Sequence, residues 1–207
     1  AAALAGEDQA ERAWAHAVEG VALTDIGRHA DALVELDEAL RLAGLAEAPA
    51  VEAWAQTFIG RSHLLRRDLG AARAALERAL VVARRIRWTA FIPLPESLLA
   101  DVDLAEGRID AAAAAYEHAY ELSLQLGDPC WEGMAARGLG VLASRTGRRA
   151  AAATWLRDAH RCCTRWPDRY VWVQAHILDA VCASGLPGAR TAVPELLDLA
   201  GRTGMRG

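Results

Sequence analysis

One short stretch, LGDPCWEG at residues 126–133, has the residue types of an active-site loop. Its Cys130 could act as a nucleophile only with a base beside it, and the first histidine that follows in the sequence is His160. The neighbours of Cys130 have a simpler interpretation, because Asp128 is a preferred helix N-cap and Pro129 suits the first helical turn. We therefore interpret the stretch as a junction between two helices, without catalysis.

The segment HRCC, with His160, Cys162 and Cys163, has the residue types of a zinc site. On a helix the two cysteines point about 100° apart, so they cannot easily reach one tetrahedral ion together with His160. The chain has four cysteines, and none of them forms a C-x-x-C pair. We expect reduced thiols, no metal site and a cytoplasmic protein.

GLGVLA at residues 138–143 matches the dinucleotide-binding pattern G-x-G-x-x-A, and Asp158 follows at a suitable distance. That pattern binds a cofactor when it follows a strand, whereas residues 132–136 continue into it as a helix. We therefore assign Gly140 to helix packing and expect no cofactor. The chain has no lysine and no nucleotide-binding, metalloprotease or nucleophile-elbow motif, so we expect a protein that is not an enzyme.

The composition is typical of a helical protein with a weakly acidic surface. Hydrophobic residues, largely Ala and Leu, make up 53% of the 207 residues and aromatic residues 6%, which favours helix over strand. The formal charge of −4 argues against nucleic acid as the main partner. No apolar run is long enough for a membrane span, and the first residues lack the pattern of a secretory signal. Because the sequence does not begin with Met, we expect it to be part of a longer protein.

The elements that would position these residues recur along the chain at a constant interval of forty positions. Small residues occupy three columns in one register, and mostly leucine occupies a fourth. The columns are Ala39, Ala79, Ala119 and Ala159; Ala32, Ala72, Ala112 and Ala152; Leu36, Leu76, Tyr116 and Leu156; and Gly20, Gly60, Ala100 and Gly140. A degenerate fifth copy continues the register with Ala180, Ala192, Leu196 and Leu199. Repetition of this length is typical of stacked helical units.

Within each copy the small residues have helical spacing on two segments that a short polar turn joins. Glycine is expected in this turn, because a left-handed residue with a Cβ atom is costly. Gly27, Gly107 and Gly147 fill the position, and Arg67 is the exception. We therefore predict an all-α fold, a single domain over residues 1–207 in which about five helical hairpins stack as a solenoid. The predicted hairpins cover 11–50, 51–90, 91–130, 131–170 and 171–203, and the last one caps the stack.

This pattern resembles the tetratricopeptide repeat (TPR) family, whose small–small–large–small columns appear as Gly20, Ala32, Leu36 and Ala39. The typical TPR is shorter, at roughly 34 residues, and the extra residues here lie between hairpins. The resemblance implies a right-handed superhelix whose concave surface is lined by the first helix of each hairpin. It places on that surface Trp14, Trp54, Phe58, Arg61, Leu94, Asp101, Met134, Arg137 and Arg145.

The predicted concave surface is rich in large apolar residues. A soluble protein gains nothing by exposing such residues unless something covers them, and tryptophans with a few arginines are typical of peptide anchors. We therefore predict that the chain binds a protein or peptide. Three alternatives stay open: the residues pack beneath neighbouring hairpins, a terminal segment fills the surface, or a small effector or substrate binds at Arg61, Asp101 and Arg137.

Charge changes sign along the second half of the chain. Residues 101–132 are acidic, and a basic segment follows from Arg137 to Arg169. We interpret the two segments as solvated faces that attract each other across a repeat interface. Contact of the basic segment with nucleic acid is the alternative, and we do not favour it because the arginines scatter around the predicted hairpin.

The C-terminal copy carries three aromatic residues that could seal the last hairpin or form a homo-oligomer interface. They are Trp166, Tyr170 and Trp172. The segments LSLQLGDPCWEG and WPDRYVWVQAHILDA, with the Ala-rich hairpins, are similar to the C-terminal helical-repeat regions of actinobacterial transcription regulators. Both the LuxR/MalT-like ATP-dependent class and the antibiotic-regulator class carry such regions. The resemblance implies a sensory or assembly role, with nucleotide hydrolysis and DNA binding supplied by other domains.

Overall fold

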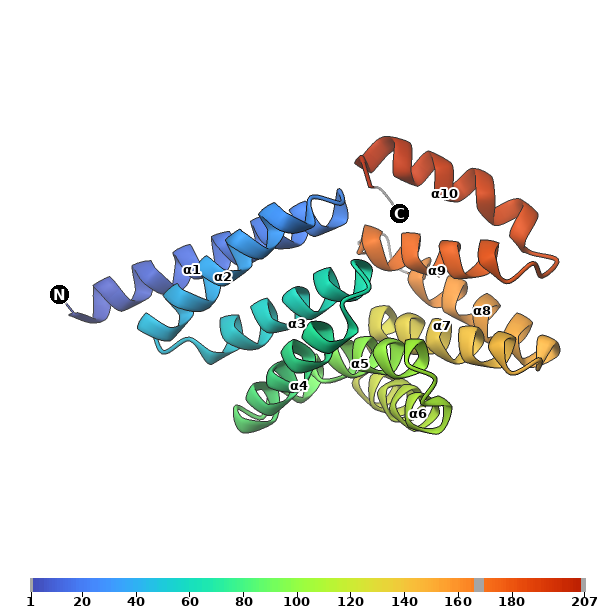
Figure 1. Cartoon of the computed structure of the whole chain (residues 1–207), viewed down its shortest axis with the longest axis horizontal. Coiled ribbons are helices and arrows are strands. Elements are labelled where there is room, and N and C mark those ends of the chain that lie inside the picture. The colour runs from blue at the N-terminus through green and yellow to red at the C-terminus, as the bar shows by residue number, and fades with distance from the viewer. Residues whose placement is uncertain (1, 166–169, 206–207) are drawn as a thin grey trace. The chain divides into compact units, whose positions relative to one another are not determined.

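The computed structural model describes residues 2–165 and 170–205, and within these ranges the chain is helical and has no strand (Figure 1). The predicted all-α fold is therefore confirmed. The helices are α1 (Ala2–Asp25), α2 (His29–Leu45), α3 (Pro49–Leu65), α4 (Leu69–Arg85), α5 (Pro93–Ala105), α6 (Ile109–Leu126), α7 (Pro129–Arg145), α8 (Arg149–Cys163), α9 (Val171–Ala183) and α10 (Ala189–Thr203). A short 3-10 helix, η1 (Thr89–Phe91), precedes α5. No helix in the described ranges combines the length and the apolar character that a bilayer span requires.

The helices group into two compact units, Ala1–Val102 and Asp103–Gly207. In the first unit α1 packs on α2 and α3, α2 packs on α3, and α3 packs on α4. In the second unit α7 packs on α6, α8 and α9, while α9 also packs on α8 and α10. Helices that are neighbours in the sequence are thus neighbours in space within each unit. The single repeat domain predicted over residues 1–207 stays a prediction.

The helix boundaries recur at the interval that the sequence columns indicate. The helices α2, α4, α6, α8 and α10 begin at His29, Leu69, Ile109, Arg149 and Ala189, which are evenly spaced at the interval of the columns. The helices α1, α3, α5 and α7 end at Asp25, Leu65, Ala105 and Arg145, again with the same spacing. Recurring residue types therefore produce recurring helices, and in three copies the same small and large side chains meet at the same places.

The turn between the two helices of a copy has the same backbone conformation in the first four copies. Gly27, Gly107 and Gly147 have φ values of 78°, 81° and 75°, in the left-handed region that the sequence predicts for them. Arg67 stands in the same column and has a φ of 65° although it carries a Cβ atom. The helix packing on either side therefore sets this conformation, and glycine makes it less costly.

Glycines on the first helices allow close approach of the second helices. A Cβ atom added to Gly20 of α1 would lie 2.5 Å from Cγ of Leu36 on α2, and Gly60 of α3 has the same relation to Leu76 of α4. These glycine and leucine columns were predicted from the sequence. Both leucines are completely buried, so each sits in the space that the missing Cβ atom leaves.

The second unit repeats this contact with one change. Gly140 of α7 faces Leu156 of α8, and a Cβ atom added there would lie 2.7 Å from the Cγ atom of Leu156. Tyr116 of α6 occupies the leucine column, and its larger ring lies against Gly138 of α7. Both glycines of the sequence GLGVLA are thus packing residues in the middle of α7. Within the described residues no strand precedes them, which removes the structural context of a dinucleotide site.

The junction between α6 and α7 has the local structure predicted from LGDPCWEG. Gly127 ends α6 with a φ of 68°, in the left-handed region. The side chain of Asp128 accepts hydrogen bonds from the backbone N–H groups of Cys130 and Trp131, at 2.9 and 3.2 Å. Pro129 is the first residue of α7, where a missing N–H group costs nothing. The interpretation of this stretch as a helix junction is confirmed.

Candidate functional site

The first unit carries a cluster of five aromatic side chains that we call the aromatic strip: Trp14, Trp54, Phe58, Trp88 and Phe91. Trp54 of α3 occupies its centre. The ring centroid of Trp54 lies 5.7 Å from that of Trp14 on α1, in edge-to-face contact, and 5.0 Å from that of Phe58. It lies 5.6 Å from Phe91 in a stacked arrangement, and Trp88 stacks on Phe91 at 4.3 Å. These separations are within or near the range of favourable aromatic pairs.

The aromatic strip is partly core and partly surface. Phe58 and Phe91 are 1% and 3% exposed, whereas Trp14, Trp54 and Trp88 are half-buried. The Nε1–H group of Trp54 is buried and has no acceptor among the described residues. A buried donor without an acceptor lowers the free energy of unfolding by about 1–3 kcal/mol. Rings that hold one another in place and still reach solvent can anchor an apolar group of a partner.

The repeat explains how two of these rings meet. Trp14 and Trp54 are one repeat interval apart, each directly after a buried alanine, on the packed helices α1 and α3. Trp88 and Phe91 were not predicted, because they lie in the connection between α4 and α5 and outside the helical columns. The sequence signal that could have found them is the pair of aromatic residues in the short interhelical stretch 86–92.

Two polar contacts join α1 to α3 at the end of α1. Nη1 of Arg61 donates to Oδ1 of Asp25 at 2.7 Å, and the hydroxyl groups of Thr24 and Ser62 lie 2.7 Å apart. Burial raises the pKa of Asp25, although the neighbouring Arg61 acts to lower it. Burial likewise lowers the pKa of Arg61, against the effect of the carboxylate. This mutual pairing accounts for Arg61 without a bound ligand.

Other predicted surface residues are covered by the chain itself. Leu94 and Met134 are completely buried and Arg137 is 5% exposed, so these three side chains offer no surface to a partner in this structure. Asp101 is half-buried. Of the three residues considered for a small-molecule or catalytic pocket, Arg61 and Asp101 belong to the first unit and Arg137 to the second. The set is therefore not assembled within either unit.

Several arginines of the basic segment, whose last residue Arg169 lies outside the described residues, bind nearby groups of the chain. Arg145 is exposed, and its Nη1 donates to the carbonyl oxygen of Leu104 at 3.0 Å. A cation is favourable there because Leu104 is in the last turn of α5. Arg161 pairs with Asp158 on its own helix at 3.1 Å. These contacts give the segment local roles at helix ends and on helix surfaces.

Two of the cysteines, Cys130 and Cys162, have thiols that burial keeps protonated. Burial and the Glu132 carboxylate raise the pKa of Cys162 to about 12, and burial raises the pKa of Cys130. Sγ of Cys162 donates to Glu132 at 3.0 Å, whereas Sγ of Cys163 donates to the carbonyl oxygen of His160 at 3.2 Å. The two adjacent thiols thus face different acceptors. In the part of the chain that the structure describes, no three metal-ligating side chains come together.

Two of the three aromatic residues predicted to seal the last copy pack against α7. Tyr170 stacks on Trp131 with the ring centroids 5.6 Å apart, and Trp172 lies 6.4 Å from the same ring. Trp131 and Trp172 are 6% and 5% exposed, and Tyr170 is 49% exposed. Trp166 lies outside the described residues. These rings join α9 to α7, and a role in self-association stays a prediction.

Comparison of the chain with protein-family models gives no match, and comparison with curated proteins gives none. The resemblance to TPR proteins therefore depends on the repeat columns of the sequence.

Proposed function

We propose that this chain is a TPR-like helical-repeat module, a solenoid of five hairpins, that binds a peptide segment of a protein partner and catalyses no reaction. The architecture is supported by features that recur at the repeat interval. Every second helix from α2 to α10 begins one repeat interval after its predecessor, and left-handed turn residues recur at the same spacing. Packing glycines opposite leucines in three copies give the same indication.

The observation that carries the binding proposal is the partial exposure of three neighbouring tryptophans, Trp14, Trp54 and Trp88, in the aromatic strip. Tryptophan is among the residues that dominate interface energies, because a rigid ring buries a large area at a small entropic cost. The buried Phe58 and Phe91 support these rings from behind and limit their motion. A preorganised apolar surface of this kind binds without first having to be ordered.

The partner that suits this surface is a peptide segment with an apolar or aromatic side chain, which would complete the contacts of the half-buried rings. The sequence resemblance leads us to propose further that the module is the sensory or assembly part of a bacterial transcription regulator. In that arrangement the aromatic strip would hold a segment of another subunit or of a regulatory protein, and other domains would contact DNA.

The test is selection of peptides from a displayed library against the complete 207-residue chain, followed by affinity measurement with fluorescence polarisation. Trp14→Ala should weaken binding of the selected peptides tenfold or more, since truncating a tryptophan that anchors a partner typically costs about 2 kcal/mol or more and about 1.4 kcal/mol corresponds to tenfold. The matched control is Trp155→Ala, because Trp155 is also half-buried and also in edge-to-face contact with one ring, Tyr120, at 5.1 Å. It should lower stability by a similar amount and leave binding unchanged.

Equal binding by the native chain and Trp14→Ala would reject the proposal. So would selected peptides that lose affinity only in Trp155→Ala. Trp14→Phe is a second variant, which keeps an aromatic ring at this position. Far-ultraviolet circular dichroism of each variant shows whether it is folded, so that loss of affinity can be separated from loss of folding.

A further inference from the structure

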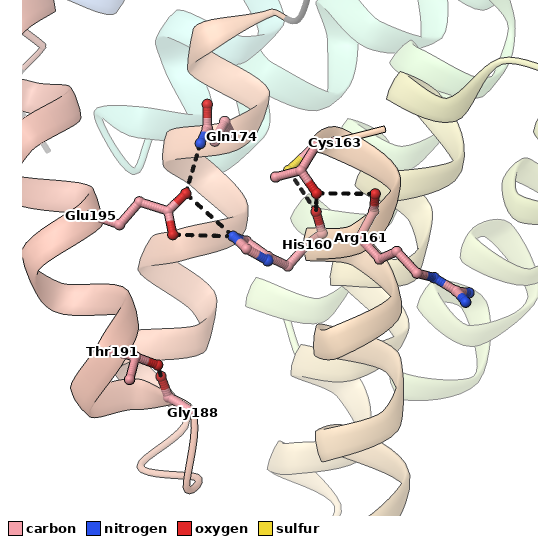
Figure 2. Close-up of polar contacts among 8 residues, drawn as sticks. His160, Arg161, Cys163, Gln174, Gly188, Thr191 and Glu195 are labelled. Carbon is pink, nitrogen blue, oxygen red and sulfur yellow. Dashed lines mark hydrogen bonds and ion pairs between the residues drawn. The ribbon is translucent and has the colours of Figure 1, made fainter. Parts of the chain in front are cut away.

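A pocket of about 270 Å³ lies within the second unit between α8, α9 and α10. Its walls are mainly apolar, with Leu156 and Ala153 from α8 and Leu178 from α9, and the loop after α9 closes one side. Glu195 of α10 supplies the carboxylate of the lining. Figure 2 shows Glu195 directed toward His160 of α8 and Gln174 of α9.

The repeat explains why a pocket occurs at this place. In the preceding pair of second helices, Tyr120 of α6 meets Trp155 of α8 through an aromatic edge contact. One repeat further on, the same two columns hold His160 and Glu195, whose side chains are 3.3 Å apart. A histidine and a carboxylate fill less space than two aromatic rings, and the carboxylate brings a charge to this junction.

The packing columns change at the same junction. Ala180 stands where Gly140 stands one copy earlier, and Leu199 stands where Ala159 stands. Larger side chains at positions of close approach hold two helices further apart. The helices α9 and α10 form a small hydrophobic cluster of their own around Leu178, Ala192 and Leu199.

Three polar side chains of the pocket carry hydrogen-bond acceptors: Glu195, Ser184 and Thr191. The carboxylate of Glu195 accepts from Gln174 at 2.9 Å and, since it cannot donate, also from Nε2 of His160 at 3.3 Å. The hydroxyl groups of Ser184 and Thr191 donate their hydrogens to backbone carbonyl oxygens at 2.6 and 2.9 Å (Figure 2 shows the bond of Thr191). Ser184 Oγ also accepts from the backbone N–H group of Leu186 at 3.2 Å, so the acceptor positions that remain for a ligand are those of Thr191 and of the Glu195 carboxylate.

We propose that this pocket binds a small apolar amine of one or two rings, with its ammonium group at Glu195. The volume of this pocket lies between that of an apolar cavity of about 150 Å³, which holds benzene, and the roughly 300–1,000 Å³ of larger ligand sites. A ligand of one or two rings therefore fits. The acceptors select a donor, and an ammonium group gives the strongest hydrogen bond to a carboxylate. Arg157 also lines the pocket and is exposed, so its charge is screened by solvent.

The experiment titrates the complete chain with tryptamine, indole and indole-3-acetate while backbone amide signals are followed by NMR. Tryptamine should bind saturably, with the largest shifts in α8, α9 and α10. Indole, which lacks the amine, should bind at least tenfold more weakly, and indole-3-acetate more weakly still. Glu195→Gln, which keeps the side-chain volume, should reduce tryptamine affinity about tenfold, to that of indole.

Glu35→Gln is the matched control, because Glu35 stands in the same repeat column and also contacts a histidine, His16, at 2.6 Å. It should leave tryptamine binding unchanged. Ala153→Leu should fill the pocket and abolish binding of all three probes. The proposal is overturned if tryptamine does not saturate, if indole-3-acetate binds as tightly, or if Glu35→Gln weakens binding as much as Glu195→Gln.

Discussion

Replacing Gly138 with alanine is expected to destabilise the second unit, although alanine is the better helix former. A Cβ atom built on Gly138 would lie 2.6 Å from Cζ of Tyr116 and closer still to Cδ1 and Cε1. Carbon atoms in good contact are about 3.5–4.0 Å apart, so the ring or the whole of α6 would have to move. Tyr116 is completely buried and cannot swing into solvent.

The expected magnitude is the difference between two effects. Replacing glycine by alanine inside a helix gains about 1 kcal/mol. Overpacking a close-packed core costs about 1–3 kcal/mol, and a rigid buried ring puts Gly138→Ala at the upper end of that range. The net loss of unfolding free energy should therefore be about 1–2 kcal/mol, or a fall in Tm of roughly 2–8 °C for a chain of this length.

Thermal and urea unfolding followed by far-ultraviolet circular dichroism would measure this loss. Tyr116→Leu restores the residue type of the other copies and removes the obstructing ring, so the double variant should lose less than the two single losses added together. The coupling energy should be about 1–3 kcal/mol. Gly201→Ala is the control, because Gly201 lies in α10 with nothing within 4 Å of its added Cβ atom, and it should be neutral or stabilising. A Gly138→Ala variant as stable as the native chain, or strictly additive losses, would refute the packing argument.

Three further predictions concern single positions. Arg67→Gly should raise the unfolding free energy by about 0.5–1 kcal/mol in urea titrations, because Arg67 has a φ of 65°, and Gly27→Ala at the equivalent turn should lower it by a similar amount. Arg61→Leu should cost about 3–5 kcal/mol in the same assay by leaving the largely buried Asp25 without its cation, and adding Asp25→Asn should recover part of the loss. Burial and a neighbouring carboxylate raise the pKa of Cys162 from 9.0 to about 12, so its contribution to stability is present below pH 9 and lost as the pH rises toward 12. Iodoacetamide at pH 8, read by mass spectrometry, should therefore label Cys162 much more slowly in the native chain than in urea; equal rates would contradict this.

The helices and their contacts could be predicted from the sequence because the information is local and repeated. The Gly20 and Leu36 columns define which faces approach closely, and the structure has both residues in contact across that interface. The turn conformation was predicted where glycine occupies the column. Arg67 adopts it without the glycine signal, since the flanking helices determine the backbone there.

The candidate sites were predicted less completely, because burial depends on neighbours that a column does not specify. Trp54 and Leu94 share one repeat position, yet the first is half-buried and the second is completely buried. Phe91 of the aromatic strip lies in the connection between α4 and α5, outside the helical columns. The contact between His160 and Glu195 joins α8 and α10, which come together only when the chain folds. The repeat register shows only that these two positions lie one copy after Tyr120 and Trp155, which are in contact.

The most direct test of the central claim is the NMR spectrum of the indole N–H groups of the seven tryptophans, recorded with and without a selected peptide. If the aromatic strip is the binding surface, the signals of Trp14 and Trp54 shift on saturation, while that of Trp172, which is buried in the second unit, keeps its position. Saturating peptide that leaves Trp14 and Trp54 unshifted would contradict the account.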